Sequence, residues 1–245
     1  MSDTHRGKYE VLGIIPARFN SQGVTNKNIR KLNNKPLIAY TIEAALKTKR
    51  LSRIIVSTDN EEIADIARTY GAEAPFLRPA ELARDDTSML PVLQYAVKFL
   101  ENKENYRTHI IVTLQPTSPL RKSYHIDEAV KKLIDNDADC VVSLCEVEHS
   151  PYWMKKIEDD KVFDFIEGAE RYTRRQDLPK VYCLNGAIYV TKYKVLMEEN
   201  KILGDNTRAI IMNQEDSVDI DTELDLKLAE LILKERHNHG KNKNC

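Results

Sequence analysis

The sequence predicts an α/β protein built on a mainly parallel sheet, and three observations carry that prediction. Apolar, strand-like runs alternate with segments of helical periodicity from residue 11 to residue 144, which is the signature of right-handed βαβ units. The first run, residues 11–17, is apolar without alternation, as expected for a strand buried on both faces. Polar loops follow the ends of several runs, where open α/β sheets bind their ligands.

Each element is predicted from its local pattern. Apolar or β-branched runs predict strands at residues 11–17, 54–56, 109–114, 140–144, 184–190 and 208–212. Apolar residues three and four apart predict helices over residues 37–46, 63–70, 90–100 and 126–134. Gly71 is expected to stop the second of these helices. A terminal helix should follow its N-cap Thr222 and turn four side chains inward: Leu224, Leu228, Leu231 and Ile232.

The alternation breaks at residues 146–180, a stretch too long for an ordinary connection. It contains His149, Tyr152 and Trp153 and ends in the polar stretch Arg171–Gln176. We interpret it as an insertion, within a single domain of residues 1–245, that packs on a second subunit. The tail, residues 237–245, is expected to be disordered.

Composition excludes several classes of protein. The formal net charge of -1 gives no overall attraction to nucleic acid or anionic lipid. No apolar run reaches membrane-spanning length, and the N-terminus lacks the apolar core of a signal peptide. The four cysteines lack C-x-x-C spacing, which is typical of reduced thiols. We therefore predict a soluble, cytoplasmic protein with no nucleic-acid or membrane partner.

The common catalytic signatures are also missing. The sequence contains neither a G-x-G-x-x-G fingerprint after the first strand nor a Walker loop. It contains no H-E-x-x-H zinc motif and no G-x-S-x-G nucleophile elbow. The chemistry must therefore be sought in the polar turns at the strand ends.

The loop after the first strand is a candidate anion site. It carries Arg18, Lys27 and Arg30, with Lys31 just beyond, among short polar side chains. Cations and backbone N–H groups both stabilise the oxygens of a polyphosphate. A solvated, charged surface loop explains the same pattern, and spacing alone leaves both readings open.

Two aspartates near the C-terminus form a candidate metal site. Asp219 and Asp221 alternate with apolar neighbours, which in an extended segment places both carboxylates on one face, about 7 Å apart at ~3.3 Å per residue. Mg²⁺ binds one or two carboxylates together with phosphate oxygens and water. The alternative is that both residues merely favour the dipole of the terminal helix.

Eight regions of the chain, in order from Ile14 to Leu233, resemble the motifs of one family. They read IIPARFNSQG…KNIRKLNNKPLIAYTIEAA, IIVSTD, FLRPAELARDDT, TLQPTSPLR, VSLCEVEHSPYW, RRQDLP, LNGAIYV and SVDIDTELDLKLAE. The chain thereby resembles the bacterial N-acylneuraminate cytidylyltransferases, which are the CMP-sialic acid synthetases and their legionaminic acid relatives.

The resemblance implies a Rossmann-like nucleotidyltransferase fold with an inserted dimerisation segment, and a homodimer. It implies that CTP activates a nine-carbon α-keto acid sugar, giving the CMP-sugar and pyrophosphate, with Mg²⁺ as cofactor. Matching positions imply catalytic roles for Arg18, Lys27 and Asp221, and metal binding by Asp219 and Asp221. The implied nucleotide-binding residues are Arg18, Ser21, Gly23, Lys27, Asn28, Arg78 and Ser88. The implied sugar-binding residues are Gln115, Arg174 and Arg175, with Lys155 a further candidate for the sugar carboxylate.

The chain departs from the family pattern in its first loop. Many relatives have A-R-G-G-S-K-G, where this chain has Phe19 and Asn20 for two small residues and Gln22 for a lysine. The proline often found at the position of Thr25 is also missing. Three alternatives stay open, the last of them because Gln22 replaces the lysine. They are the same reaction on N,N′-diacetyllegionaminate, a KDO cytidylyltransferase, and a catalytically silent nucleotide-sugar sensor.

Overall fold

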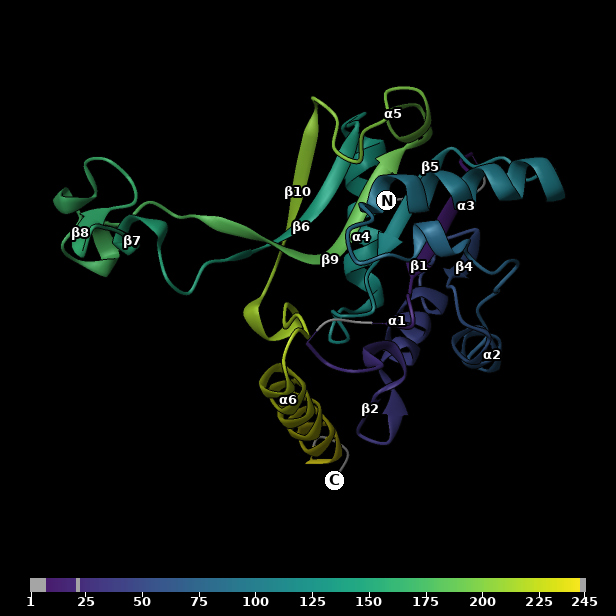
Figure 1. Ribbon diagram of the computed structural model, residues 1–245, viewed down its shortest axis with the longest axis horizontal. Coiled ribbons are helices and arrows are strands. Elements are labelled where there is room, and N and C mark those ends of the chain that lie inside the picture. The colour runs from purple at the N-terminus through teal and green to yellow at the C-terminus, as the bar shows by residue number, and fades with distance from the viewer. Residues whose placement is uncertain (1–7, 21–22, 243–245) are drawn as a thin grey trace.

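The fold is a three-layer α/β/α arrangement with one long projecting arm (Figure 1). The computed structural model describes residues 8–20 and 23–242. Its central sheet has six strands in the order β10-β6-β9-β5-β1-β4. These strands are β1 Val11–Pro16, β4 Arg53–Ser57, β5 Ile110–Leu114, β6 Cys140–Glu146, β9 Tyr182–Lys192 and β10 Thr207–Met212.

The sheet is mainly parallel, as the sequence predicted. β1 runs parallel to β4 and β5, and β10 runs parallel to β6. β9 runs antiparallel to both of its neighbours, β5 and β6. Every residue of β1 is buried, in agreement with its unbroken apolar run.

Helices cover both faces of the sheet. On one face the apolar sides of α1 (Leu37–Leu46), α2 (Glu61–Thr69) and α4 (Ser123–Asp135) form the larger core. On the other face, α3 (Met89–Glu104) and α5 (Tyr193–Met197) pack on Leu12, Ile14 and Ile111. No helix within the described ranges is long and apolar enough to cross a bilayer.

A small hairpin between β1 and α1 was not predicted. Its strands β2 (Lys31–Leu32) and β3 (Lys35–Pro36) pair antiparallel. Asn33 and Asn34 join them with φ values of 48° and 64°. Asparagine tolerates this left-handed conformation, so the Asn-Asn dipeptide was the available signal for a tight hairpin turn.

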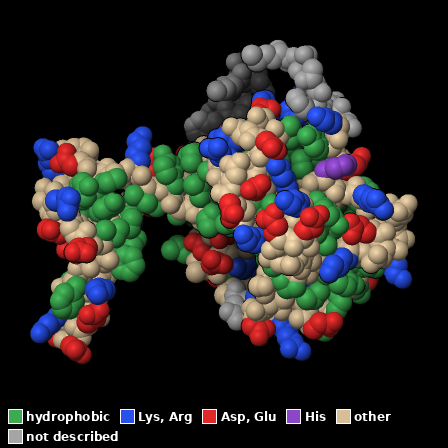
Figure 2. Space-filling model, turned by 90° about the horizontal axis from the view of Figure 1, so that it is seen from above, with side chains coloured by type: hydrophobic (Ala, Val, Ile, Leu, Met, Phe, Trp, Pro, Cys, Tyr) green, Lys and Arg blue, Asp and Glu red, His purple; other side chains and the backbone are tan. Residues whose placement is uncertain are grey.

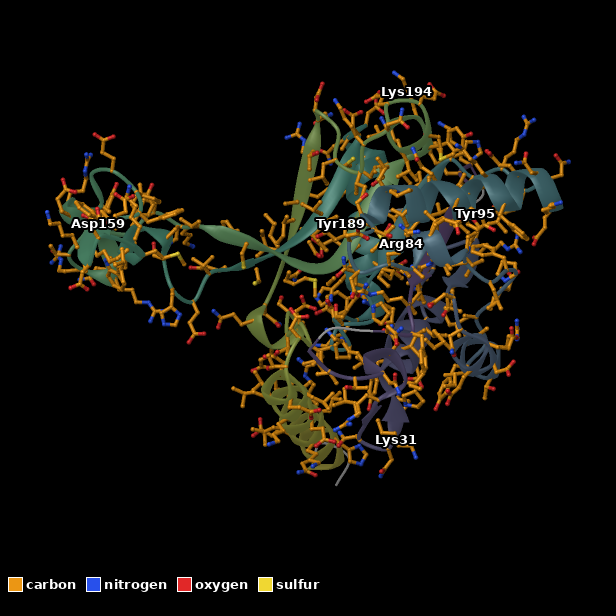
Figure 3. The ribbon with its side chains drawn as sticks, in the orientation of Figure 1. Lys31, Arg84, Tyr95, Asp159, Tyr189 and Lys194 are labelled. Atoms are coloured by element: carbon orange, nitrogen blue, oxygen red, sulfur yellow. The ribbon has the colours of Figure 1, made fainter. Side chains whose placement is uncertain are left out.

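Residues 147–181, here called the arm, project from the body between β6 and β9 (Figures 1 and 3, where Asp159 marks the tip). The tip is a hairpin of β7 (Lys155–Glu158) and β8 (Lys161–Asp164). Trp153 Nε1 donates a 2.9 Å hydrogen bond to the carbonyl of Tyr172, which ties the arm's two halves together. Hydrophobic side chains gather on the arm in Figure 2, and exposed ones include Trp153, Met154, Ile157, Val162, Phe163 and Phe165.

The terminal helix α6 (Glu223–Asn242) corrects two predictions. Leu226 and Ala229 are buried against Leu32 and Ile220, and Ile232 packs beside them. Of the four side chains predicted to face inward, only Ile232 does so, and the three leucines are exposed: Leu224, Leu228 and Leu231. The prediction was wrong because α6 packs on a satellite core near β2, and that geometry selects a different stripe of the helix.

The ends of α6 gave one confirmed prediction and one wrong one. Thr222 is the N-cap, since its hydroxyl accepts the backbone N–H of Asp225 at 3.3 Å. Residues 237–242 continue the helix and do not form the disordered tail predicted for residues 237–245. No proline interrupts the segment, and extending an existing helix requires no new nucleus. Residues 243–245 lie outside the described ranges.

A buried ion cluster fastens α6 to the body. Asp216 is fully buried and pairs with Arg236 of α6 at 2.6 Å and with Lys122 before α4 at 3.1 Å. His125 Nε2 lies 3.7 Å from the same carboxylate. Burial of the imidazole lowers the pKa of His125 to about 4, even though Asp216 opposes the shift.

The lowered pKa of His125 predicts a dependence of stability on pH. The unfolded chain takes up the imidazole proton near pH 6.5, whereas the folded chain resists it down to about pH 4. Stability should therefore fall as the pH drops through this window, by up to roughly 3 kcal/mol from this group. In urea unfolding at pH 7, 6, 5 and 4, His125→Gln should show a shallower loss. His149→Gln, at an exposed position of the arm, is the matched control and should follow the parent chain.

Candidate functional site

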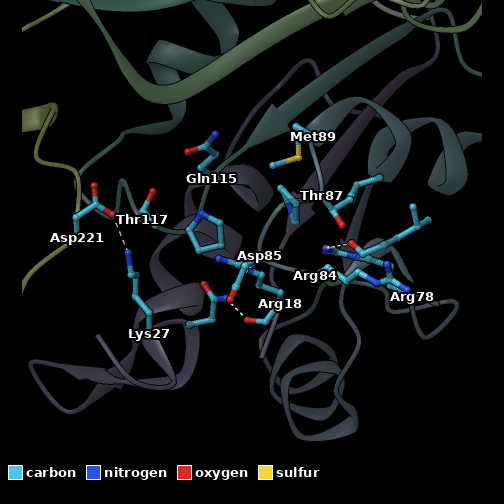
Figure 4. A pocket seen from close by; sticks show the side chains of 15 residues that line it. Arg18, Lys27, Arg78, Arg84, Asp85, Thr87, Met89, Gln115, Thr117 and Asp221 are labelled. Carbon is cyan, nitrogen blue, oxygen red and sulfur yellow. Dashed lines mark hydrogen bonds and ion pairs between the residues drawn. The ribbon is translucent and has the colours of Figure 1, made fainter. Parts of the chain in front are cut away.

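A cavity of about 410 Å³ opens at the carboxyl edge of the sheet (Figure 4). Segments far apart in the sequence supply its walls: the loop after β1, the stretch between β4 and α3, the turn after β5, and the segment before α6. Its volume lies in the range of small-molecule sites. The lining residues are Pro16, Arg18, Lys27, Asn28, Arg78, Leu82, Arg84, Asp85, Thr87, Met89, Val92, Gln115, Pro116, Thr117 and Asp221.

The loop after β1 brings two predicted cations into this cavity. Arg18 follows β1 by two residues, and its carbonyl accepts a 2.7 Å hydrogen bond from Asn28 Nδ2. Lys27 opens a short 3₁₀ helix and is buried, with its Nζ 2.9 Å from Asp221 Oδ1. Both cations therefore lie in one cavity together with one of the two predicted metal ligands.

Gly23 allows the loop to pack directly on Asp221. Its φ is 83°, and a Cβ at this position would lie 2.3 Å from the carbonyl oxygen of Asp221. Only glycine satisfies both conditions without displacement of the backbone. Ser21 and Gln22, the neighbouring positions of interest, lie outside the described residues.

Arg78 forms a wall of the cavity and is largely engaged by the protein. Its guanidinium donates to the carbonyls of Ser57 and Leu82 and to the Ser57 hydroxyl. Burial lowers its pKa to about 10. Ser88 is the N-cap residue of α3 and stands between two lining residues, Thr87 and Met89, without lining the cavity itself.

The side chains of Gln115 and Asp219 both lie close to a second glycine, Gly186. At Gly186, whose φ is 70°, a Cβ would lie 3.1 Å from Gln115 Oε1 and 3.6 Å from Asp219 Oδ2. Buried Arg121 donates a 2.6 Å hydrogen bond to the carbonyl of Gln115 and a 3.1 Å hydrogen bond to that of Ala187. Burial lowers the pKa of Arg121 to about 9. Arg121 thus fixes the turn that carries Gln115.

The two aspartates flank a buried anchor. Ile220 is buried, and its N–H donates to the carbonyl of Thr117 at 2.8 Å. Burial, followed by the negative charge of Asp221, raises the pKa of Asp219. A cation bound beside the two aspartates would stabilise the ionised form of Asp219. In the part of the chain that the structure describes, no group of three or more His, Cys, Asp or Glu side chains is arranged to hold a metal alone.

A smaller cavity, of about 210 Å³, adjoins the first. The two share Met89 and Gln115. The remaining walls of the second cavity are mostly apolar: Leu93, Thr113, Tyr189, Ile202 and Leu203. The site therefore has a polar, cationic compartment beside an apolar one.

The structure does not bring the predicted arm residues to this site. Arg174 and Arg175 lie on the arm, and neither lines either cavity of its own chain. Arg174 forms a bidentate pair with Asp177, and Lys155 pairs with Asp164. Arg175 has no such ion pair among the described residues.

From the stretch before α3, sequence reasoning named Ser88 but not the residues that line the cavity. Arg84, Asp85 and Thr87 of this stretch line the larger cavity, as does Met89, the first residue of α3. Asp85 Oδ1 lies 2.5 Å from Arg18 Nη1. The available signal was a run of polar residues, 84–88, immediately before a helix that packs on the inner strands.

Comparison with known sequences identifies the family. The sequence profile described as cytidylyltransferase matches residues 12–237. The chain belongs to the cytidylyltransferase family. It is a nucleotidyltransferase by that membership, and the fold and the cavity agree with it.

Several curated relatives resemble the chain at similar levels. It is 38% identical over 227 residues to the CMP-N,N′-diacetyllegionaminic acid synthase of Campylobacter jejuni, covering 91% of this chain and 95% of that one. It is 36% identical to the post-translational flagellin modification protein B of Campylobacter coli, with 95% and 98% covered. It is also 36% identical to the N-acylneuraminate cytidylyltransferase of Escherichia coli, covering 95% of this chain but only 54% of that longer protein.

Solved structures support the fold. A structure of CMP:2-keto-3-deoxy-manno-octonic acid synthetase complexed with CTP matches with a TM-score of 0.70 at 16% identity, covering 93% of this chain and 99% of that one. The 4-diphosphocytidyl-2C-methyl-D-erythritol synthase of Anaerococcus prevotii matches with a TM-score of 0.65 at 14% identity, covering 95% and 100%. The predicted nucleotidyltransferase fold is thereby confirmed.

Replacing Gly23 with alanine should impair the cytidylyltransferase. The new Cβ would collide with the carbonyl of Asp221, so the loop must move away from the acidic segment. We expect a loss of about 1–2 kcal/mol in unfolding free energy and a fall in turnover of roughly tenfold or more. Gly71→Ala is the matched control, since Gly71 has a similar φ of 93° but faces Leu46. Equal turnover of the two variants would contradict the importance of the Gly23–Asp221 contact.

Proposed function

We propose that the protein transfers the cytidylyl group of CTP to a nine-carbon α-keto acid sugar, releasing pyrophosphate. The observation that carries this proposal is the convergence of Arg18, Lys27 and Asp221 in one cavity. These residues come from opposite ends of the chain, and its relatives include a CMP-N,N′-diacetyllegionaminic acid synthase and an N-acylneuraminate cytidylyltransferase.

The triphosphate of CTP fits the cationic end of the larger cavity. Arg18 and Lys27 stand on the loop after β1, and Asn28 fixes the backbone of that loop. Guanidinium and ammonium groups neutralise the charge that accumulates on phosphate oxygens during phosphoryl transfer. The cytidine would then extend toward Arg78 and Thr87, which line the same cavity.

The sugar fits the smaller, more apolar cavity. Gln115 borders both cavities, so a sugar held there places its anomeric hydroxyl toward the α-phosphate. Tyr189, Leu203 and Ile202 present apolar surface suited to an N-acyl group. Holding both reactants in adjoining compartments supplies the proximity that a displacement at phosphorus requires.

Mg²⁺ is the cofactor we propose, held by Asp219 and Asp221. The donor set fits: both ligands are carboxylates, and burial, followed by the negative charge of Asp221, raises the pKa of Asp219. Thr117 lies beside this segment, since its carbonyl accepts the N–H of Ile220 at 2.8 Å. The ion would supply neutralisation of the α-phosphate and a lower pKa for the attacking hydroxyl.

The chain's own residues perform the remaining work. Lys27 holds Asp221 at 2.9 Å and thereby orients the carboxylate before any ligand arrives. Gln115, fixed through Arg121, is placed to hydrogen-bond the sugar. The α-phosphate is attacked by the anomeric oxygen of the sugar, and pyrophosphate leaves toward Arg18. Either aspartate is a possible proton acceptor, although a metal-bound carboxylate is a poor base.

We propose that the protein acts as a homodimer in which the arm reaches the partner's site. The arm exposes a continuous set of apolar side chains that a single copy leaves uncovered. Of the three candidates for the sugar carboxylate, Arg175 alone lacks an ion pair within the described residues, so its guanidinium is available for bidentate binding. In its own chain it lies away from both cavities.

Two sugars of the same class compete as the substrate. The resemblance favours N-acetylneuraminate, while the 38% identity to a CMP-N,N′-diacetyllegionaminic acid synthase favours N,N′-diacetyllegionaminate. The sugars differ in the substituents at positions 7 and 9. A relative from Campylobacter jejuni named pseudaminic acid cytidylyltransferase, 34% identical, adds a third nine-carbon candidate.

The decisive experiment measures pyrophosphate release from CTP and Mg²⁺ with each sugar in turn. We expect release with a nine-carbon sugar and little with KDO, because the apolar walls beside Gln115 suit an N-acyl group, which KDO lacks. ATP, GTP and UTP, each in place of CTP, test whether the enzyme selects the cytosine base. Binding of CTP without release in the presence of any sugar would contradict the proposed reaction and favour a nucleotide-sugar sensor.

Two impaired variants should complement each other in a shared site. Asp221→Asn should lower turnover by ~10² or more, the scale of losing one charge-stabilising group. Arg175→Ala should raise the KM for the sugar. When the two variants are unfolded together and refolded, mixed dimers carry one intact site, so about a quarter of the parent activity should return. If mixing restores nothing while each variant still dimerises, the arm does not serve the partner's site.

A further inference from the structure

Arg84 differs from the other three cations that line the larger cavity. Arg18 pairs with Asp85, and Lys27 pairs with Asp221. The guanidinium of Arg78 donates hydrogen bonds to Ser57 and Leu82. The side chain of Arg84 lines the cavity and is exposed, with no ion pair or side-chain hydrogen bond to any residue in the described ranges. It is the one cation of this lining that has neither an ion pair nor a side-chain hydrogen bond within that part of the protein.

The position of Arg84 relates it to the phosphate end of the site. It is adjacent in sequence to Asp85, whose carboxylate lies 2.5 Å from the Arg18 guanidinium. Consecutive Cα atoms are about 3.8 Å apart, so Arg84 directly neighbours the residue that pairs with Arg18. Figure 4 shows Arg84 between Arg18 and Arg78 on the wall opposite Lys27.

The backbone around Arg84 is held in a turn. The N–H of Thr87 donates to the carbonyl of Arg84 at 3.2 Å, and the Thr87 hydroxyl donates to the carbonyl of Glu81 at 3.1 Å. These hydrogen bonds fix the backbone that carries the unpaired side chain of Arg84. The two carboxylates that line the cavity, Asp85 and Asp221, already pair with Arg18 and Lys27. An anionic partner for Arg84 would therefore be a ligand.

We propose that Arg84 is a ligand of the nucleotide's phosphates, on the opposite wall of the cavity from Lys27. This role rests on the proposed binding of CTP at this site. Its effect is to clamp the polyphosphate between the loop after β1 and the stretch before α3. When the phosphates arrive, Arg18 exchanges Asp85 for a phosphate oxygen. Arg84 adds a positive charge that is not already paired with a carboxylate of the described residues.

Calorimetric binding to the full chain tests the assignment with CTP, CMP, cytidine and pyrophosphate as four separate ligands. Arg84→Gln should weaken CTP and pyrophosphate by about tenfold or more, the scale of a charge-assisted hydrogen bond. It should leave cytidine unchanged. Arg84→Lys should recover part of the loss, because lysine keeps the charge without the planar fork.

Arg107→Gln is the matched control, an exposed arginine in the connection between α3 and β5. It should bind all four ligands as the parent chain does. Equal binding of CTP and pyrophosphate by Arg84→Gln and the parent chain would overturn the role of Arg84 and leave the proposed function intact. An equal loss for cytidine and CTP would likewise overturn it, by placing Arg84 at the base or ribose. Failure of the parent chain to bind CTP would overturn both proposals.

Discussion

The ion pair between Lys27 and Asp221 is the interaction on which the site depends. It joins two residues 194 positions apart, one in the loop after β1 and one in the segment before α6. The Lys27 side chain is only 8% exposed, so removing its partner would leave a charge in a poorly solvated place, which is costly. Gly23 adds a backbone contact to the same aspartate. Together these contacts fix the position of the loop after β1 relative to the segment before α6.

Much of the body could be predicted because its elements obey local rules. β1, β5 and α1 followed from apolar runs and helical spacing, and the parallel order followed from their alternation. The alternation of Asp219 and Asp221 with apolar neighbours predicted a metal site, and the structure shows that Ile220 between them is buried. The buried face of α6 was not predictable in the same way. Its apolar stripes are similar in strength, and the satellite core around Leu32 selects between them.

The site was predictable only in part, for a physical reason. Sequence patterns indicate which loops gather at a sheet edge, and Arg18, Lys27 and Gln115 were found by that rule. They do not indicate how charges pair once the loops meet. Asp85 satisfies Arg18, and the carbonyls of Ser57 and Leu82 occupy Arg78. The distinction between an engaged cation and a free one exists only in three dimensions, which is why Arg84 carried no signal of its own.

The pairing of cations with carboxylates has a consequence for how a polyphosphate binds. Arg18 and Lys27 face Asp85 and Asp221 at 2.5 Å and 2.9 Å, so each must exchange one anionic partner for another when phosphates enter. Such an exchange contributes less to affinity than the neutralisation of a free cation, because the Coulomb attraction to the first partner is lost. It does, however, preorganise the side chains. Net attraction must then come from a charge outside these pairs. Of the two lining arginines outside them, Arg78 is buried and hydrogen-bonded to Ser57 and Leu82, which leaves the exposed guanidinium of Arg84.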